Sequence, residues 1–325
     1  MQNPKIPILI VAHQRSNYLS KVIEAAIKCQ PSSIYVSVDG PRGEILGETE
    51  RVAKCRNIVE TKAKNSLIPF KIKFRDINIG CAANILDSID WLFDSEPNGL
   101  ILEEDCLPEI SAVQMVSQQL KLCENYSNIW MVSGFRPTVE GIEIGKSFLT
   151  HLPLGWGWGT WAHKWKDMRE SILNDAFNNN FYKNLTSNSA QVYWNIGARR
   201  ASLGWIDTWD LQLADAMLRN DKLNLVGPLN QISNIGVDSF SLHTEGKNEF
   251  LETGTSLWRI LDFNERDLDF SKTVISNNDK NIWRFMIGIR WHHKYLPIIK
   301  YLYQRVTKFQ SGRGPLKDRL KSSKF

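Results

Sequence analysis

The sequence predicts an α/β fold: a mixed, mainly parallel sheet flanked by helices, with a basic helical extension at the C-terminus. Two observations predict it. Short runs of β-branched and apolar residues alternate with amphipathic segments of helical period through the first half of the chain. The chain has 325 residues, 42% of them hydrophobic and 23% charged, which is enough to bury a core of this kind.

The first half is predicted to contain four strands, each followed by a helix. The strands are expected at Ile6–His13, Ser33–Gly40, Phe70–Asp76 and 99–103. The helices are expected at Tyr18–Lys28, Glu48–Lys64, Asn78–Phe93 and from Pro108 to about Tyr126. Strands alternating with helices of this length indicate βαβ units, and therefore parallel pairing.

The second half is less regular. A Gly- and Trp-rich segment covers His151–Trp165, and an Asn-rich stretch at Asn174–Asn188 is expected to form a loop or short helices. A helix is predicted after Asp207 or Thr208, because either residue can act as an N-cap. A strand and a loop are expected within Leu223–Thr244.

The charge of the chain is unevenly distributed. Its net charge is +5, but the segment from Arg284 to Phe325 holds eleven basic residues and one acid, a net of +10, which leaves −5 on the preceding 283 residues. Aromatic and aliphatic residues alternate with the basic ones, so we expect this tail to dock on an anionic membrane surface. The alternative is a helix packed on the core with a solvated basic end. No recognition motif accompanies the charge, which argues against a nucleic-acid partner.

Cysteine usage and the N-terminal residues bear on the cellular location. The cysteines are odd in number and lack the CxxC or Cys/His spacing of a zinc site: Cys29, Cys55, Cys81, Cys106 and Cys123. We interpret them as reduced side chains of a cytoplasmic protein. No signal-peptide pattern is visible, and no stretch approaches the ~20 apolar residues of a membrane span. The expected location is cytoplasmic, peripheral on the inner face of the plasma membrane where the tail docks.

Three predicted strand ends hold polar side chains, and in α/β sheets ligands bind beyond the carboxyl ends of the strands. These ends are His13-Gln14-Arg15, Asp39-Gly40 and Glu103-Glu104-Asp105. The first turn contains neither GxGxxG nor GxxxxGK[ST]. Dinucleotide-dependent oxidoreductases and P-loop ATPases therefore lose support.

The third strand end, in the stretch "GLILEEDCLPE", places three carboxylates next to one another. Adjacent carboxylates repel each other, so they are stable only when solvated or when they hold a cation. Mn²⁺ and Mg²⁺ accept such oxygens, commonly one or two from the protein together with substrate phosphates. The alternative is a solvated turn whose negative charge complements the dipole of the following helix.

The motifs "ILIVAHQR", "VSVDGP", "RDINIG" and "ILEEDC", in this order, resemble those of GT-A nucleotide-sugar glycosyltransferases. The order and spacing are most similar to the N-acetylglucosaminyltransferase I type and its bacterial relatives. The resemblance covers roughly residues 6–244. It implies a Rossmann-like GT-A domain over residues 1–270, with a nucleotide-binding half to about 135 and an acceptor half from 136 to 270. Residues 271–325 would form the basic, aromatic extension.

The resemblance also implies a bound Mn²⁺ or Mg²⁺. The similar enzymes carry an acidic, DxD-type triplet at this strand end, and its last acid binds the metal ion. That acid is Asp105 here, with Glu103 and Glu104 as supporting residues. His243 is a further candidate for contact with the metal or the diphosphate, although a lone histidine is more often structural.

Five residues are expected to contact the nucleotide: His13, Arg15, Asp39, Asn84 and Glu104. Asp39 would accept hydrogen bonds from a uracil or ribose group, and Arg15 would pair with the diphosphate or close over the base. Asn84 would contact the nucleotide or its phosphates. The structural alternatives are an Asp-Gly turn, a solvated loop arginine and an amide on a helix surface.

Tryptophan is abundant, with twelve residues in the chain. Indole faces stack on sugar rings, although most tryptophans are simply core residues. In "GWGWGTW" we expect Trp156 and Trp158 to line the sugar site, because the glycines let a ligand approach the backbone closely. Core packing is the alternative for both.

An inverting sugar transfer needs one carboxylate beside the acceptor hydroxyl to take its proton. The resemblance assigns this base to the Trp-Asp pair Trp209-Asp210, with Asp210 as the base and Trp209 on the sugar or acceptor side. Asp207 and Asp215 compete for the role. Asp207 also fits a helix N-cap, and Asp215 lies on a different helix face from Asp210.

The expected function is metal-dependent, inverting transfer of a hexosyl or N-acetylhexosaminyl group from a nucleotide-diphosphate donor, UDP-linked by resemblance. The acceptor would be a hydroxyl of a glycan or lipid-linked sugar, as in bacterial surface polysaccharide synthesis. A sugar-1-phosphate nucleotidylyltransferase is one alternative, but it should carry a GxGxRL-like loop where this chain has "AHQRSNYL". A non-catalytic carbohydrate-binding protein would explain the tryptophans and leave the acids unexplained.

Overall fold

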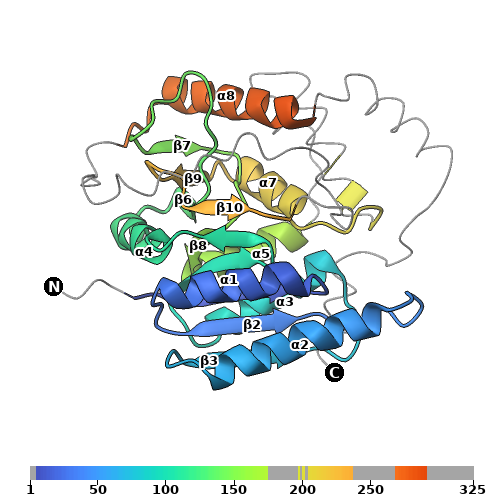
Figure 1. The fold of residues 1–325 in the computed structure, drawn as a ribbon. Helices are drawn as coiled ribbons and strands as arrows, with labels where there is room; N and C mark the ends of the chain where they lie inside the picture. The colour runs from blue at the N-terminus through green and yellow to red at the C-terminus, as the bar shows by residue number, and fades with distance from the viewer. Residues whose placement is uncertain (1–4, 175–196, 198–199, 202–203, 237–267, 291–325) are drawn as a thin grey trace.

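The computed structural model describes residues 5–174, 197, 200–201, 204–236 and 268–290. These residues form an α/β structure in which helices cover both faces of a central sheet (Figure 1). The sheet has eight strands in the order β3-β2-β1-β4-β8-β6-β9-β7, and a small second sheet pairs β10 with β5. The predicted α/β fold with a mixed, mainly parallel sheet is confirmed.

The strands of the first half form the parallel part of the sheet. They are β1 (Ile8–Ala12), β2 (Ile34–Val38), β3 (Phe70–Phe74) and β4 (Asn98–Glu103). The second part begins with β8 (Trp158–Trp161), which runs antiparallel between β4 and β6 (Ile129–Ser133). It continues with β9 (Leu223–Val226), parallel to β6, and β7 (Phe148–Thr150), antiparallel to β9. A single sheet therefore contains strands from both halves of the chain.

Alternating side chains along the strands build two cores, one on each face of the sheet. Ile8 and Ile10 belong to the core that buries α1, α2 and α4, whereas Leu9 and Val11 belong to the core that buries α3, α5 and α7. The first three helices are α1 (Ser16–Lys28), α2 (Glu48–Lys64) and α4 (Ala112–Cys123). The other three are α3 (Cys81–Phe93), α5 (Ala162–Leu173) and α7 (Asp210–Arg219).

One predicted helix start is wrong. Pro108 ends the short strand β5 (Cys106–Pro108), and α4 begins only at Ala112. The chain stays extended here because β5 pairs antiparallel with β10 (Ile232–Asn234), and the Glu109 N–H donates to the Gln231 carbonyl at 2.8 Å. Strands β6, β7 and β8 and helix α5 were not predicted, since the short strands have no alternating pattern long enough to recognise.

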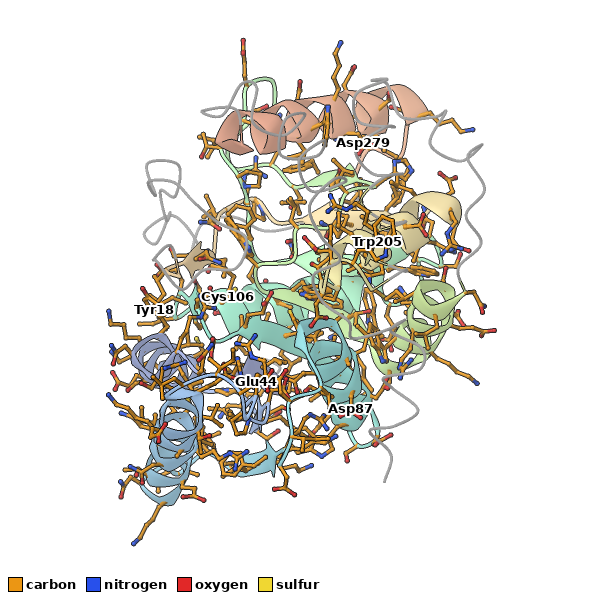
Figure 2. The ribbon with its side chains drawn as sticks, turned by 90° about the vertical axis from the view of Figure 1, so that its right-hand side faces the viewer. Tyr18, Glu44, Asp87, Cys106, Trp205 and Asp279 are labelled. Carbon is orange, nitrogen blue, oxygen red and sulfur yellow. The ribbon has the colours of Figure 1, made fainter. Side chains whose placement is uncertain are left out.

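The first part of the C-terminal extension packs against the fold. Helix α8 (Lys272–Arg290) lies beside β7, and the Asn278 amide donates to the Leu149 carbonyl at 2.9 Å. Asp279 of α8 (Figure 2) accepts bonds from the Thr150 hydroxyl at 2.6 Å and the His151 N–H at 2.8 Å. Membrane docking is predicted for Arg284–Phe325. Its first seven residues form the end of α8, and residues 291–325 lie outside the described residues. Within the described part of the chain, no helix combines the length and the apolar character needed to cross a membrane.

The His151 ring links α8 to the rest of the fold in a way that depends on pH. Its Nδ1 lies 2.8 Å from an Asp279 carboxylate oxygen, and its Nε2 lies 3.0 Å from one of Asp221. Burial lowers the pKa of His151, but the hydrogen bonds and charges of these two carboxylates outweigh it and raise the pKa above its ordinary 6.5. The imidazolium therefore stabilises the docked helix.

We predict that part of the stability of the fold is lost as the pH rises through the raised pKa of His151. A histidine whose pKa is raised by folding contributes its full stabilisation below pH 6.5, and this contribution disappears above its folded pKa. His151→Gln should lower Tm at pH 6, by an amount equivalent to about 1 kcal/mol, and change it less at pH 9. His163→Gln, at an exposed position on α5, is the matched control. Equal losses for His151→Gln at both pH values would contradict the prediction.

Candidate functional site

The carboxyl ends of β1, β2 and β4 lie side by side, because these three strands are neighbours and parallel. His13 follows β1, Asp39 follows β2, and β4 ends at Glu103. The sheet thus brings together the three polar strand ends that the sequence singles out. In α/β sheets this edge is where ligands bind.

Glu104 organises the turn between β1 and α1. Its side chain is buried, and one carboxylate oxygen accepts the His13 N–H at 2.8 Å and the Arg15 N–H at 3.4 Å. The other oxygen accepts the Arg15 Nε–H at 2.7 Å. The backbone N–H groups of this turn therefore donate to the Glu104 carboxylate.

Arg15 also reaches the neighbouring acid. Its Nη2 donates to an Asp105 carboxylate oxygen at 2.7 Å, so that one guanidinium bonds to two adjacent carboxylates. Burial lowers the pKa of Arg15, but the charges of Glu104 and Asp105 outweigh it and raise the pKa. Burial raises the pKa of Asp105 above its ordinary value, and Arg15 only partly offsets this shift. The negative charge of the pair is incompletely compensated.

Asp39 holds the loop between β3 and α3. One of its carboxylate oxygens accepts the N–H groups of Gly40 and Ile79, and the other accepts the N–H of Gly80 and the Asn78 amide, at 2.9–3.1 Å. The His13 ring lies 3.2 Å from the Asn78 amide nitrogen and 3.2 Å from Glu48. Asp39 and His13, both predicted to contact the nucleotide, therefore belong to one hydrogen-bonded network at the carboxyl ends of β1 and β2.

Asn84 lies deeper than the other predicted nucleotide residues. It is buried on the first turn of α3, and its amide oxygen accepts the Arg75 Nε–H at 2.9 Å and the Ser37 hydroxyl at 3.4 Å. These bonds tie α3 to β2 and to the segment after β3. The Asn84 amide oxygen is therefore engaged inside the protein by Arg75 and Ser37.

Trp209 is buried against Gly155 and Trp158 of the Gly- and Trp-rich segment. A Cβ on Gly155 would lie 2.9 Å from the Trp209 ring, so only glycine leaves room for this indole. Trp209 also stacks on Trp158, with ring centroids 5.7 Å apart and an interplanar angle of 16°. Trp158 is 1% exposed, which favours the core-packing alternative over contact with a sugar. Trp156 is partly exposed and packs against Phe135, with centroids 4.8 Å apart.

Glu103 has a strongly altered proton affinity at this edge of the sheet. Burial, together with the negative charges of Asp105 and Asp210, raises the pKa of Glu103 to about 8. A hydrogen bond from Trp209 and the charge of Arg15 oppose the shift without cancelling it. Glu103 therefore retains its proton near neutral pH, and an acid of the first half interacts with an acid of the second.

Asp210 is the first residue of α7 and is exposed to solvent. One of its carboxylate oxygens accepts the Leu211 N–H at 2.9 Å and a short bond from the Thr208 hydroxyl. The competing acid Asp215 is paired with Arg219 one turn further along α7, at 2.7 Å. Of these two acids, Asp210 is the one that faces solvent near Glu103.

Asp207 closes the site from the side of α3. Its carboxylate accepts the Cys81 N–H at 3.0 Å and the Ala82 N–H at 3.2 Å, and so caps a helix more than one hundred residues earlier in the chain. Burial raises the pKa of the Cys81 thiol well above its usual value, and the charges of Glu103, Asp207, Asp210 and Asp39 raise it further. Asp207 thus caps α3 directly, and Glu103, Asp210 and Asp39 add negative charge near Cys81 at the start of this helix.

Trp205 is the exposed tryptophan closest in sequence to Asp210. It is 52% exposed, which is unusual for an indole, and lies on the segment that leads into α7 (Figure 2). Sequence reasoning did not select it, because "LGWID" shows no signal that separates an exposed tryptophan from a buried one. The sequence also does not distinguish Glu103 from its neighbours, because its link to Trp209 and Asp210 exists only in the folded chain.

The side chains at the end of β4 partly fit a divalent cation. Asp105 supplies a hard carboxylate oxygen, and Glu103 would supply another on losing its proton to a bound cation. Mn²⁺ or Mg²⁺ commonly uses only one or two such ligands with substrate phosphates. In the described part of the chain, no three His, Cys, Asp or Glu side chains converge as a complete metal site. His243 lies outside the described residues. The metal remains a prediction.

Comparisons with known proteins give a limited result. No protein-family model matches the chain, and no curated protein matches it. Among solved structures, a UDP-glucose pyrophosphorylase in complex with UDP-glucose aligns with a TM-score of 0.34 and 9% sequence identity, over 71% of this chain and 91% of that chain. A likeness at this level carries no functional conclusion, so we base the function on the residues themselves.

We predict that Glu103→Gln stabilises the fold at high pH. A carboxyl with a pKa of 4.5 when unfolded and about 8 when folded loses stability as the pH rises between these values, because the folded protein resists the loss of the proton. Glutamine keeps the shape and removes the charge. In EDTA, Tm should therefore rise by about 3 °C at pH 8 and stay unchanged at pH 4. Glu170→Gln on α5 is the exposed control. A similar rise at both pH values would show that charge is not the cause.

Proposed function

We propose that this chain is an inverting glycosyltransferase that takes a sugar from a nucleotide-diphosphate donor, UDP-linked in the first instance. The proposal is supported by the strand-edge acids Glu103, Glu104 and Asp105 and by the resemblance of the ordered motifs around them. The acceptor is a hydroxyl of a glycan or a lipid-linked sugar.

The observation that carries the proposal is the pairing of two unlike carboxyl groups at this edge. Glu103, at the end of β4, has its pKa raised to about 8, whereas Asp210 is exposed at the start of α7 and contributes to that shift. Asp210 is exposed and available as a general base, and the strongly perturbed proton affinity of the neighbouring Glu103 is typical of a functional site.

Each group has a definite task in the proposed reaction. Asp210 accepts the proton of the acceptor hydroxyl as the new bond to C1 forms and the bond from C1 to the diphosphate breaks. Arg15 supplies positive charge beside the departing diphosphate. Mn²⁺ or Mg²⁺ held by Asp105 would neutralise charge on the diphosphate as it leaves. Direct displacement with a single base inverts the configuration at C1.

The acceptor side is assigned to the segment before α7. Trp205 is 52% exposed, lies five residues before the proposed base, and is the first candidate for contact with a sugar ring. Asp207 fixes this segment by capping α3, so the indole and Asp210 are held on one short, anchored stretch. Trp156, partly exposed beside Phe135, is a second candidate for contact with sugar.

A sugar-1-phosphate nucleotidylyltransferase is less well supported. That chemistry would use the turn after β1 to hold a triphosphate through its backbone N–H groups. Here the N–H groups of His13 and Arg15 already donate to Glu104. A phosphate at this turn would have to displace a buried carboxylate.

The alternative of a non-catalytic carbohydrate-binding protein is no longer supported by the high tryptophan content. Four tryptophans of the second half, Trp158, Trp161, Trp165 and Trp209, are each at most 5% exposed. Their faces are used inside the protein, so the high tryptophan content does not indicate a sugar-binding surface.

We predict that UDP with Mn²⁺ raises Tm, and that it does so more than GDP or CMP with Mn²⁺. Ligand that binds only the folded protein stabilises it by about 2.7 kcal/mol at a concentration one hundred times its Kd. Thermal-shift measurements of each nucleotide with and without Mn²⁺ provide the test. A protein that no nucleotide stabilises would not be a nucleotide-sugar enzyme of either kind.

We also predict that Asp210→Asn preserves donor binding and abolishes most of the transfer. Loss of a general base costs about 10²–10⁴ in kcat, while UDP affinity should change little. Release of UDP from UDP-sugars, with and without added saccharide acceptors, measures the first effect, and calorimetry with UDP measures the second. Asp167→Asn, an exposed change on α5, is the control. If UDP affinity falls together with turnover, Asp210 belongs to the donor site.

A further inference from the structure

Arg15 holds two carboxylates in different ways. Glu104 is bound through Nε at 2.7 Å and accepts two backbone N–H groups in addition, so it belongs to the turn itself. Asp105 is bound through Nη2, at 2.7 Å, and its other oxygen accepts a weak bond from the Cys106 thiol at 3.7 Å. The bond to Asp105 is therefore the one that can be exchanged without opening the turn.

The backbone at Gly236 packs closely against the Arg15–Asp105 ion pair. A Cβ on Gly236 would lie 2.0 Å from an Asp105 carboxylate oxygen and 2.7 Å from Arg15 Nη1, so glycine is needed beside the pair. Arg15 Nη1 points to the Gly236 carbonyl at a long 3.4 Å. The Arg15 side chain is 19% exposed to solvent, so the guanidinium can move toward the solvent side of the site.

Electrostatics favours the exchange. A divalent cation on Asp105 would place positive charge next to the guanidinium that now occupies the same carboxylate, and the two would repel each other. An incoming diphosphate offers Arg15 a new bidentate partner. A change in the Arg15 side-chain torsions would carry Nη2 from Asp105 to the diphosphate, while the backbone N–H groups of the turn stay on Glu104.

We propose that Arg15 and a divalent cation bind Asp105 in alternation: Arg15 blocks the metal position in the free protein and is released to the diphosphate when donor and metal enter together. The inference rests on the proposed function. It makes metal binding in the absence of nucleotide weak, and it makes nucleotide and metal bind cooperatively through Arg15.

The test measures Mn²⁺ affinity by calorimetry, with and without UDP, in the full chain. Without nucleotide, Arg15→Gln should bind Mn²⁺ about tenfold more tightly than the wild type, because Asp105 is no longer paired. With Mn²⁺ present, the same variant should bind UDP about tenfold more weakly, because the diphosphate has lost a partner. A purely structural role for Arg15 would not produce changes of opposite sign.

Three further proteins make the outcome decisive. Arg15→Lys keeps the charge but cannot span two carboxylates, so its Mn²⁺ affinity should also exceed that of the wild type, and it carries the test where Arg15→Gln is poorly folded. Arg15→Gln combined with Asp105→Asn should lose the gain. Arg169→Gln, which removes an ion pair to Asp90 away from the site, should change neither affinity.

Unchanged or weaker Mn²⁺ binding in both Arg15 variants overturns the inference, whatever UDP does. The proposed function fails separately, when UDP binds none of the proteins with or without Mn²⁺. A gain in Mn²⁺ affinity without any nucleotide binding would support the competition for Asp105 and remove the glycosyltransferase assignment.

Discussion

The buried carboxylate of Glu104 is the group on which the rest of the site depends. It ends β4 by bonding to the turn that follows β1, and it fixes Arg15 through Nε. Burying the Glu104 charge without either the backbone N–H groups or Arg15 would destabilise the fold by several kcal/mol. The turn after β1, the position of Arg15 and the end of β4 are therefore formed together. Asp105 and Glu103 take their positions from this arrangement, because they flank Glu104 in the chain.

A second constraint joins the two halves of the molecule. Gly155 makes room for Trp209, Trp209 stacks on Trp158 and donates to Glu103, and Asp207 caps α3. The glycines and tryptophans that look like a sugar-binding motif in the sequence thus serve to place one exposed acid, Asp210, against the strand-edge acids. The packing of Trp209 in the core thus fixes the position of Asp210, the next residue in the chain, at the surface.

Much of the fold could be predicted from the sequence, because hydrophobic period and strand-end chemistry are local properties. The helix at Glu48–Lys64 was predicted with its observed ends, and the acids at the end of β4 were identified. The turn at Pro108 was not, since β5 is extended only through pairing with β10, more than one hundred residues away. The same limit applies to the site. The partners of Glu103 and Asp207 come from distant segments, and no local pattern reveals them.

The position of β8 has a consequence for how the chain can reach its structure. This strand, residues 158–161, lies between β4 and β6, which both precede it in the chain. During synthesis the edge of β4 stays unpaired until β8 has emerged, and β6 has no neighbour on that side either. An exposed strand edge invites pairing with other chains. A fragment that stops near residue 135 would keep this edge permanently, so division of the protein at the boundary between its halves should yield an aggregating first half.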